Sequence, residues 1–340
     1  MRITKNECIN LIKKSDLLEL GQQANKLKFE KFGNIVTFII DRNINYTNIC
    51  QNECDFCAFF RRKNQKSAYL LSHEEILEKV REAVDLGATQ VMIQGGLNPE
   101  LDLEYYEKML RLIKLNFNIT IHSFTATEIQ YFANLEGISI LEVLKRLQSA
   151  GLDSLPGGGA EILVDEIRKK ISPKKISSYD WINVMKLAHS IGMESTATMV
   201  IGFGETLEQR IEHMEKIRQL QDETGGFRAF IMWSFQPKNT KLGGEKVSAW
   251  DYMKTLAVSR IYLDNIEHIQ GSWVTQGEKI GQLTLSFGAD DLGSIMLEEN
   301  VVKAAGTSYE MSMKKMIDLI KTTGNTPAQR DTRYEILKKF

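Results

Sequence analysis

Three cysteines are crowded into one short stretch of the chain, Cys50, Cys54 and Cys57, with the spacing C-x3-C-x2-C. Thiolates are strong metal ligands, and three of them so close in sequence can share one centre. A closed zinc site needs four protein ligands, and iron–sulfur clusters are normally held by four cysteines. The fourth cysteine, Cys8, lies far upstream. Three ligands leave one metal position open, which favours catalysis over a structural role.

Two alternatives to catalysis stay open on the spacing alone. The first is a structural zinc protein whose fourth ligand comes from elsewhere in the chain, and the second is an iron–sulfur electron carrier. Neither function requires a scaffold of 340 residues.

The composition restricts the partners of the chain. It is 43% hydrophobic and 26% charged, which is ordinary for a globular protein with a large core. A formal net charge of -1 provides no basic field, so we expect no nucleic-acid and no membrane partner. The first residues lack the apolar segment of a signal peptide, and no apolar run is long enough to cross a membrane. We therefore expect a cytoplasmic protein.

Short apolar strands alternate with amphipathic helices along most of the chain. Glycines at 87, 151 and 192 end predicted helices, as is typical of a C-cap. Strands are predicted at 34–40, 90–93, 119–122, 196–201 and 228–233. This alternation predicts right-handed βαβ units and a parallel sheet. About eight such units without a linker favour an α/β fold of the (β/α)8 TIM-barrel type over an open doubly wound sheet.

We expect three parts in the chain: an N-terminal helical extension over 1–32, the barrel over 33–306, and a C-terminal helical segment over 307–340 that packs on the barrel. In such barrels the chemistry is carried by the loops at the carboxyl ends of the strands. The cysteine loop follows the strand at 34–40 and therefore occupies such a position.

The cysteine spacing, with the aromatic Phe56 before the last cysteine, resembles the signature of the radical S-adenosylmethionine (radical SAM) enzymes. The resemblance implies a barrel of that type and a 4Fe–4S cluster held by Cys50, Cys54 and Cys57. It also implies that S-adenosylmethionine chelates the open iron and is cleaved to a 5′-deoxyadenosyl radical, which takes a hydrogen atom from the substrate. A one-electron reductant such as flavodoxin or ferredoxin would supply the electron.

The same resemblance predicts residues that bind S-adenosylmethionine: Phe56, Gln94, Gly95, Gly96, Ser123, Gly202 and Glu205. Gly95 and Gly96 follow the second strand, where backbone without side chains can approach the methionyl group closely. Gly202 and Glu205 follow the strand at 196–201 and are expected near the adenosyl half. The alternatives are a simple turn for the glycine pair and ordinary core packing for Phe56.

Two acidic residues are candidate catalytic groups. Glu161 follows three consecutive glycines, which are entropically costly and make sense where backbone lies against a ligand. Glu161 would then project into the barrel mouth as a base. Asp290 is adjacent to Asp291, and repulsion between the two carboxylates would raise a pKa. The alternatives are a surface turn at Glu161 and two solvated carboxylates at 290–291.

Longer runs resemble one branch of the radical SAM family, the enzymes that cyclise dehypoxanthine futalosine in menaquinone biosynthesis. The runs HSFTATEI at 122–129 and DETGGF at 222–227 favour this branch. The runs GGGAE and GADD are shared with aminofutalosine synthases and with the enzymes that make the deazaflavin precursor, which stay as alternatives. The resemblance implies hydrogen abstraction from ribose C4′ and addition of the carbon radical to the benzoate ring of the substrate.

Overall fold

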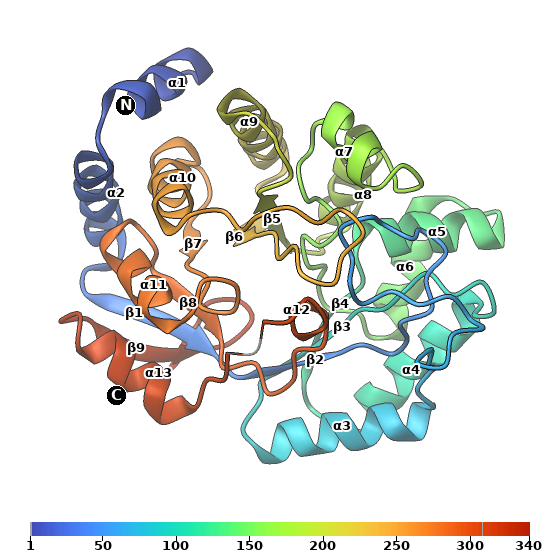
Figure 1. Cartoon of the computed structure of the whole chain (residues 1–340). Coiled ribbons are helices and arrows are strands. Elements are labelled where there is room, and N and C mark those ends of the chain that lie inside the picture. The colour runs from blue at the N-terminus through green and yellow to red at the C-terminus, as the bar shows by residue number, and fades with distance from the viewer. Residues whose placement is uncertain (1, 308) are drawn as a thin grey trace.

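A computed structural model describes residues 2–307 and 309–340. Helices surround a set of strands in the view of Figure 1. The helices are α1 (Lys5–Lys14), α2 (Leu17–Phe32), α3 (His73–Asp85), α4 (Leu103–Asn116), α5 (Ala126–Glu136), α6 (Ile140–Ala150), α7 (Asp165–Ile171), α8 (Ser178–Ser190), α9 (Leu207–Thr224), α10 (Ala249–Tyr262), α11 (Glu278–Leu283), α12 (Val301–Ala304) and α13 (Met313–Lys321). The strands are β1 (Ile35–Ile39), β2 (Asp41–Ile44), β3 (Gln90–Ile93), β4 (Thr120–Ser123), β5 (Ser195–Ile201), β6 (Phe227–Ser234), β7 (His268–Gln270), β8 (Asp291–Ser294), β9 (Thr326–Arg330) and β10 (Ile336–Lys339).

The parallel strand pairs follow one another in a ring. β1 pairs with β8, and pairing continues through β7 and β6 to β5. β2, which is separated from β1 by Ile40, pairs with β3, and β3 pairs with β4. Isolated parallel bridges join His122 of β4 to Ser154, and Leu155 to Ser195 of β5. The chain is therefore an α/β protein, and its ring of parallel pairs is consistent with the predicted (β/α)8 barrel.

Side chains at the helix starts fix where the helices begin. Ser72 and Thr206 form reciprocal capping boxes with the residue three positions on, as their sequence patterns predict. Thr125 forms another such box with Glu128 and begins α5, a helix that the periodicity did not reveal. Because α5 follows β4 directly, this cap lies at the carboxyl end of the strands, beside the cysteine loop.

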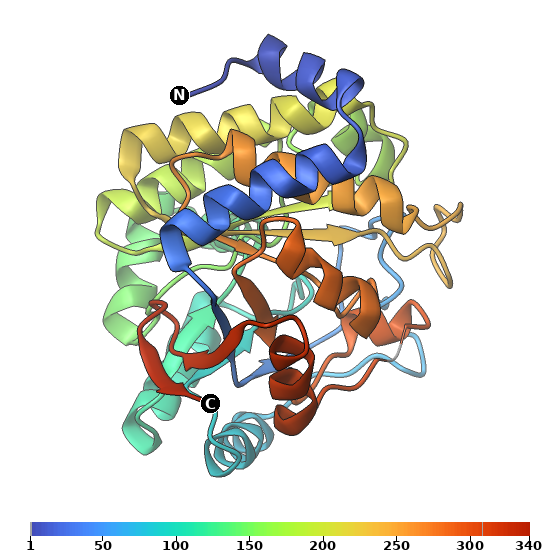
Figure 2. The same cartoon turned by 90° about the vertical axis from the view of Figure 1, so that its left-hand side faces the viewer.

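The predicted N-terminal helix is divided in two. The first half ends at Lys14 with Ser15 as its C-cap, and Asp16 caps α2 through a reciprocal capping box with Glu19. α1 packs on α9, and α2 packs on α10, so both helices lie on the outside of the barrel (Figure 2). None of the helices in the described ranges is both long and apolar enough to cross a membrane.

The C-terminal segment is only partly helical, which corrects the expectation for 307–340. After α13, the strands β9 and β10 form an antiparallel pair, and β9 runs parallel to β1. The reason is that β3 pairs with β2 and leaves an edge of β1 that a further strand can cover. Figure 2 shows the pair on the side of the barrel away from the cysteine loop. The domain boundaries at 32 and 306 stay a prediction.

Candidate active site

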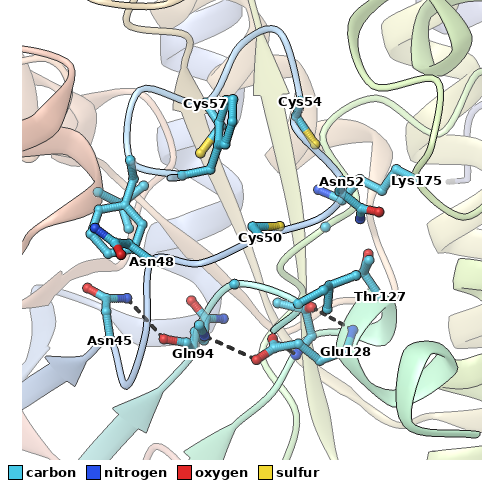
Figure 3. Close-up of a pocket in the computed structure, with 18 of the residues that line it drawn as sticks. Asn45, Asn48, Cys50, Asn52, Cys54, Cys57, Gln94, Thr127, Glu128 and Lys175 are labelled. Atoms are coloured by element: carbon cyan, nitrogen blue, oxygen red, sulfur yellow. Dashed lines mark hydrogen bonds between the residues drawn. The ribbon is translucent and has the colours of Figure 1, made fainter. Parts of the chain in front are cut away.

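The three cysteines line one cavity at the carboxyl ends of β2 and β3 (Figure 3). Backbone hydrogen bonds hold the loop: the Cys50 amide donates to the Arg61 carbonyl at 3.1 Å, and the Cys57 amide donates to the Cys54 carbonyl at 3.0 Å. The Arg61 guanidinium also donates to the carbonyls of Ala58 and Phe60, at 2.9 and 2.7 Å. The three cysteines line one cavity, as predicted, and hydrogen bonds within the loop hold them there.

Burial makes free thiolates unfavourable in this cavity. It raises the pKa of the Cys54 thiol to about 12, with Lys175 opposing the shift, and it raises the pKa of Cys57 as well. A bound metal reverses this preference, because metal ligation needs deprotonated sulfur. Three cysteines that line a common cavity, one of them buried and two partly buried, therefore fit a cationic cluster.

Within residues 2–307 and 309–340, no three His, Cys, Asp or Glu side chains are close enough together to hold a single metal ion. An iron–sulfur cluster makes a different demand, because it binds each cysteine through a separate iron. Sulfurs that face a cavity from different sides, as in Figure 3, meet that demand.

Gly95 and Gly96 let the cysteine loop lie directly on the end of β3. A Cβ on Gly96 would be 2.2 Å from the carbonyl oxygen of Ile49, and a Cβ on Gly95 would be 2.4 Å from the Tyr46 ring. Both glycines line the cavity with the cysteines, as does the preceding Gln94. The glycine pair is thus required by packing, in addition to any contact with a ligand.

Glu128 organises the wall of the cavity that faces the cysteines, and sequence reasoning did not assign it a role. Its carboxylate accepts hydrogen bonds from the Tyr46 hydroxyl at 2.8 Å, the Gly95 amide at 3.1 Å and the Thr125 amide at 2.7 Å. Burial raises the pKa of Glu128, and these donors oppose the shift. The T-x-x-E capping pattern at Thr125 is the signal that could have located it.

Thr127 has a buried side-chain hydroxyl that could hydrogen-bond to a ligand in the cavity. Its Oγ1 is buried without a hydrogen-bond partner among the described residues, and the side chain lines the cysteine cavity. Buried hydroxyls are normally satisfied, so this one is available to a bound molecule. Thr127 does not cap α5, because Thr125 performs that function.

Glu161 is buried and is not among the residues that line the cysteine cavity, so its predicted role as a base stays a prediction. Its backbone has a positive φ of 41°, and its Oε1 is 2.7 Å from Nζ of Lys175. Lys175 lines the cysteine cavity, and its Nζ is 5.3 Å from the centroid of the Phe56 ring. Glu161 therefore positions a lysine that faces the cysteines, and a lone lysine in a polar loop offered no sequence signal.

Three predicted cofactor residues are not among those that line the cavity. The Ser123 hydroxyl accepts the Ile93 amide at 3.1 Å and so joins β4 to β3. The Glu205 carboxylate accepts the amide of Gly202 and is 2.8 Å from Nε of Arg210, so it stabilises its own turn. That turn reaches the site only through Phe203, whose ring centroid is 5.4 Å from that of Phe56. Phe56 itself does line the cavity.

Asp290 has neither the position nor the raised pKa expected of a catalytic group. It precedes β8, at the amino end of the strand, and Arg260 and His268 bind its two carboxylate oxygens. Although burial opposes ionisation, these two partners lower the pKa of Asp290. The expected raised pKa is wrong, because the Arg260 guanidinium pairs with this carboxylate and His268 hydrogen-bonds to it. It is also buried, so the solvated alternative is wrong too.

A second cavity lies inside the ring of strands. It is lined by Ile39, Asp41, Gln90, Met92, Gln94, His122, Pro156, Gly158, Thr196, Thr198, Arg228, Ile231, Trp233, Gln270, Ser294, Met296, Arg330, Thr332 and Tyr334. Gln94 lines both cavities, so it stands between the cysteines and the interior of the barrel. The C-terminal residues Arg330, Thr332 and Tyr334 reach this interior from beyond α13.

Comparison with known proteins identifies the class. A model of the radical SAM superfamily matches residues 44–217, and a model of the CofH/MqnC C-terminal region matches residues 224–339. The chain belongs to the radical SAM superfamily and is an enzyme of that superfamily. Membership implies a 4Fe–4S cluster and S-adenosylmethionine as cofactors, and Cys50, Cys54 and Cys57 are the residues that fit the cluster.

Two curated relatives are named cyclic dehypoxanthine futalosine synthase. The one from Halalkalibacterium halodurans is 46% identical over 100% of this chain and 92% of its own length, and the one from Streptomyces coelicolor is 46% identical over 99% and 86%. A relative from Archaeoglobus fulgidus, 44% identical over 92% of each chain, is named 5-amino-6-(D-ribitylamino)uracil–L-tyrosine 4-hydroxyphenyl transferase.

Solved structures support the fold. Methylornithine synthase (PylB) aligns with a TM-score of 0.77 at 20% identity, covering 96% of this chain and 95% of that one. The FeFe-hydrogenase maturase HydG from Carboxydothermus hydrogenoformans aligns with a TM-score of 0.77 at 18% identity, covering 98% and 77%.

Proposed function

We propose that this enzyme converts dehypoxanthine futalosine to its cyclic form in menaquinone biosynthesis. The observation that carries the proposal is 46% identity, over essentially the whole chain, to two curated proteins with that name. The partners would be this small-molecule substrate and a one-electron donor such as flavodoxin or ferredoxin. Oxygen-sensitive thiolate ligation of iron fits a reducing compartment, so we propose that the reaction takes place in the cytoplasm.

When bound, the cluster and S-adenosylmethionine supply a radical that can take one hydrogen atom from the substrate. The protein's tasks are to hold, orient and shield the reactants. Cys50, Cys54 and Cys57 would hold the cluster, and Lys175 adds a positive charge to the wall of the same cavity. Gln94, on the boundary between the two cavities, would contact both the cofactor and the substrate.

The proposed reaction balances without an external oxidant. The substrate loses the hydrogen atom at ribose C4′, and the new carbon radical bonds to the benzoate ring. Loss of one proton to solvent and of one electron then restores the aromatic ring, so the product is lighter than the substrate by two hydrogen atoms. The electron would return to the one-electron carrier that supplied one for the cleavage of S-adenosylmethionine, so no net electron is consumed. S-adenosylmethionine is consumed to 5′-deoxyadenosine and methionine.

A second candidate activity comes from the relative in Archaeoglobus fulgidus, which is almost as similar. Its name points to L-tyrosine and 5-amino-6-(D-ribitylamino)uracil as substrates. An anaerobic assay with reductant and S-adenosylmethionine separates the two candidates by product mass. We expect a product two hydrogens lighter than dehypoxanthine futalosine, and no product from the tyrosine pair. Product from the tyrosine pair alone would overturn the proposal.

A further inference from the structure

The cavity inside the barrel contains a buried guanidinium that its surroundings do not satisfy. Arg228 lies near the amino end of β6, and its side chain is only 8% exposed. Its Nε is buried without a hydrogen-bond partner among the described residues. One terminal nitrogen is 3.5 Å from Nδ1 of His122, and the nearest carboxylate, that of Glu194, is 3.8 Å away and half exposed. A buried cation with so little compensation is costly.

A second arginine of the same cavity, Arg330, has a carboxylate partner that balances its charge. Asp291 binds Arg330 through both of its oxygens, at 2.6 and 3.1 Å. Although burial opposes the charge, Asp291 raises the pKa of Arg330, whereas burial lowers the pKa of Arg228. His122 is neutral, because burial and the two arginines keep its pKa well below the ordinary value, and a neutral imidazole supplies no counter-charge to Arg228. Asp41, the acidic residue in the lining of this cavity, accepts hydrogen bonds from Ser294 and Gln90 and not from Arg228. Among the described residues, the lining therefore offers Arg228 no carboxylate partner, and the anion of a ligand would fit beside it.

The cavity wall formed by β6 is charged at the amino end of the strand and becomes apolar and aromatic toward its carboxyl end. From the amino end to the carboxyl end it presents Arg228, Ile231 and Trp233. This stretch spans about 16 Å of strand. Met92 of β3 adds a further apolar side chain to the lining. The carboxyl ends of the strands carry the cysteine loop, so the cation lies at the end of the cavity away from the cysteines.

We propose that Arg228 binds the carboxylate of an aromatic carboxylate substrate, whose ring lies against Ile231 and Trp233 and whose other end reaches the cysteine cavity. A planar carboxylate can accept paired hydrogen bonds from a guanidinium. The inference rests on the proposed function only for the choice of substrate, which carries a benzoate group. It assigns Arg228 as the residue that fixes the depth and the orientation of that substrate.

A binding experiment separates this role from a structural one. The probes are 3-acetylbenzoate and its uncharged analogue 3-acetylbenzamide, titrated into the anaerobic holoenzyme by calorimetry or ligand-observed NMR. Three variants are compared with the wild type: Arg228→Gln, Arg228→Lys and Glu194→Gln. The last removes the nearest carboxylate without touching the cavity lining, so it tests whether Arg228 serves that ion pair instead.

We expect the wild type to bind the acid about 10- to 100-fold more tightly than the amide, as for a hydrogen-bonded charge pair. Arg228→Gln should abolish this preference while binding the amide as the wild type does, which also shows that the variant is folded. Arg228→Lys should retain part of the preference, and Glu194→Gln all of it. Equal affinities for acid and amide in the wild type, or an equal loss of both in Arg228→Gln, would overturn the inference.

The outcomes also separate this inference from the proposed function. A wild type that prefers the acid through Arg228 but does not turn over dehypoxanthine futalosine overturns the proposed function and supports the carboxylate site. A wild type that turns over this substrate without an Arg228-dependent preference overturns the carboxylate site alone.

Discussion

At the scale of single residues, the pair formed by Glu161 and Lys175 links the triple-glycine loop to the cysteine cavity. Both side chains are about nine-tenths buried, and a positive φ at Glu161 directs its carboxylate toward the lysine. Such a backbone conformation in a residue other than glycine costs free energy and persists only where the surroundings hold it. We infer that this strain is retained because it places Lys175.

Replacing Glu161 by Gln tests this pair. The substitution leaves a buried ammonium without its partner, so we expect a loss of roughly 3 kcal/mol in the free energy of unfolding. Urea unfolding of the anaerobic protein measures it. Glu166→Gln, at an exposed position of α7, is the control and should change stability by less than about 0.5 kcal/mol. A stable Glu161→Gln variant with normal turnover would show that the pair has no such role.

Gly96 makes a second prediction at this scale. In Gly96→Ala the new Cβ meets the backbone of Ile49, which cannot rotate away, so the cysteine loop must shift. We expect a loss of about 1–3 kcal/mol in stability and a clear fall in iron retained per chain. Gly192→Ala is the control for iron: its φ of 77° strains alanine, but nothing lies near its Cβ, so this variant should lose some stability and keep its iron. Normal iron in Gly96→Ala would contradict the packing argument.

At the scale of elements, β9 and β10 extend the sheet beside β1, and β9 is joined to β8 by an ion pair. Arg330 on β9 binds Asp291 on β8, and Asp291 also accepts the Thr37 hydroxyl of β1 at 2.6 Å. One buried carboxylate thus joins three strands, so the C-terminal pair is part of the barrel instead of an added helical layer.

The prediction at this scale concerns Arg330→Met. Removing the cation leaves Asp291 buried and unpaired, so we expect a loss of about 3–5 kcal/mol, measured by urea unfolding. The double variant Arg330→Met with Asp291→Asn should recover part of this loss, because it removes the unpaired charge as well. Additive losses in the double variant would mean that the two residues act separately.

The elements also show what the sequence can predict. The strand at Gln90–Ile93 and the cap at Ser72 depend on neighbouring residues, so local patterns locate them. The segment Thr326–Arg330 contains a proline and becomes a strand only because β1 offers an edge. The environment of Asp290 depends on Arg260, and that of Glu161 on Lys175; both partners are placed by the fold. The spacing of the cysteines is local, so the sequence could predict that they face one cavity; that they hold the cluster stays a prediction.

At the scale of the whole molecule, buried neutral histidines make stability depend on pH. Burial lowers the pKa of His213 to about 3 and that of His189 to about 4. Their ordinary value in an unfolded chain is near 6.5. Between these values only the unfolded chain binds the protons, so acid favours unfolding.

We therefore expect the free energy of unfolding to fall as the pH drops from about 6.5 to about 4, by about 1.4 kcal/mol per pH unit for each histidine. Urea unfolding at several pH values measures the slope. In His213→Asn the side-chain oxygen can replace Nδ1 as the acceptor of the Leu163 amide, and the contribution of one histidine should disappear. An unchanged slope in this variant would contradict the assignment.

The most direct test of the whole account is the formation of 5′-deoxyadenosine by anaerobically reconstituted protein given S-adenosylmethionine and dithionite. Iron and sulfide content should be measured on the same samples. We predict that the wild type and Cys8→Ala, which alters the buried cysteine of α1, carry the cluster and form deoxyadenosine. Alanine at Cys50, Cys54 or Cys57 should abolish both. Full iron content and deoxyadenosine formation in any of these three variants would contradict the account.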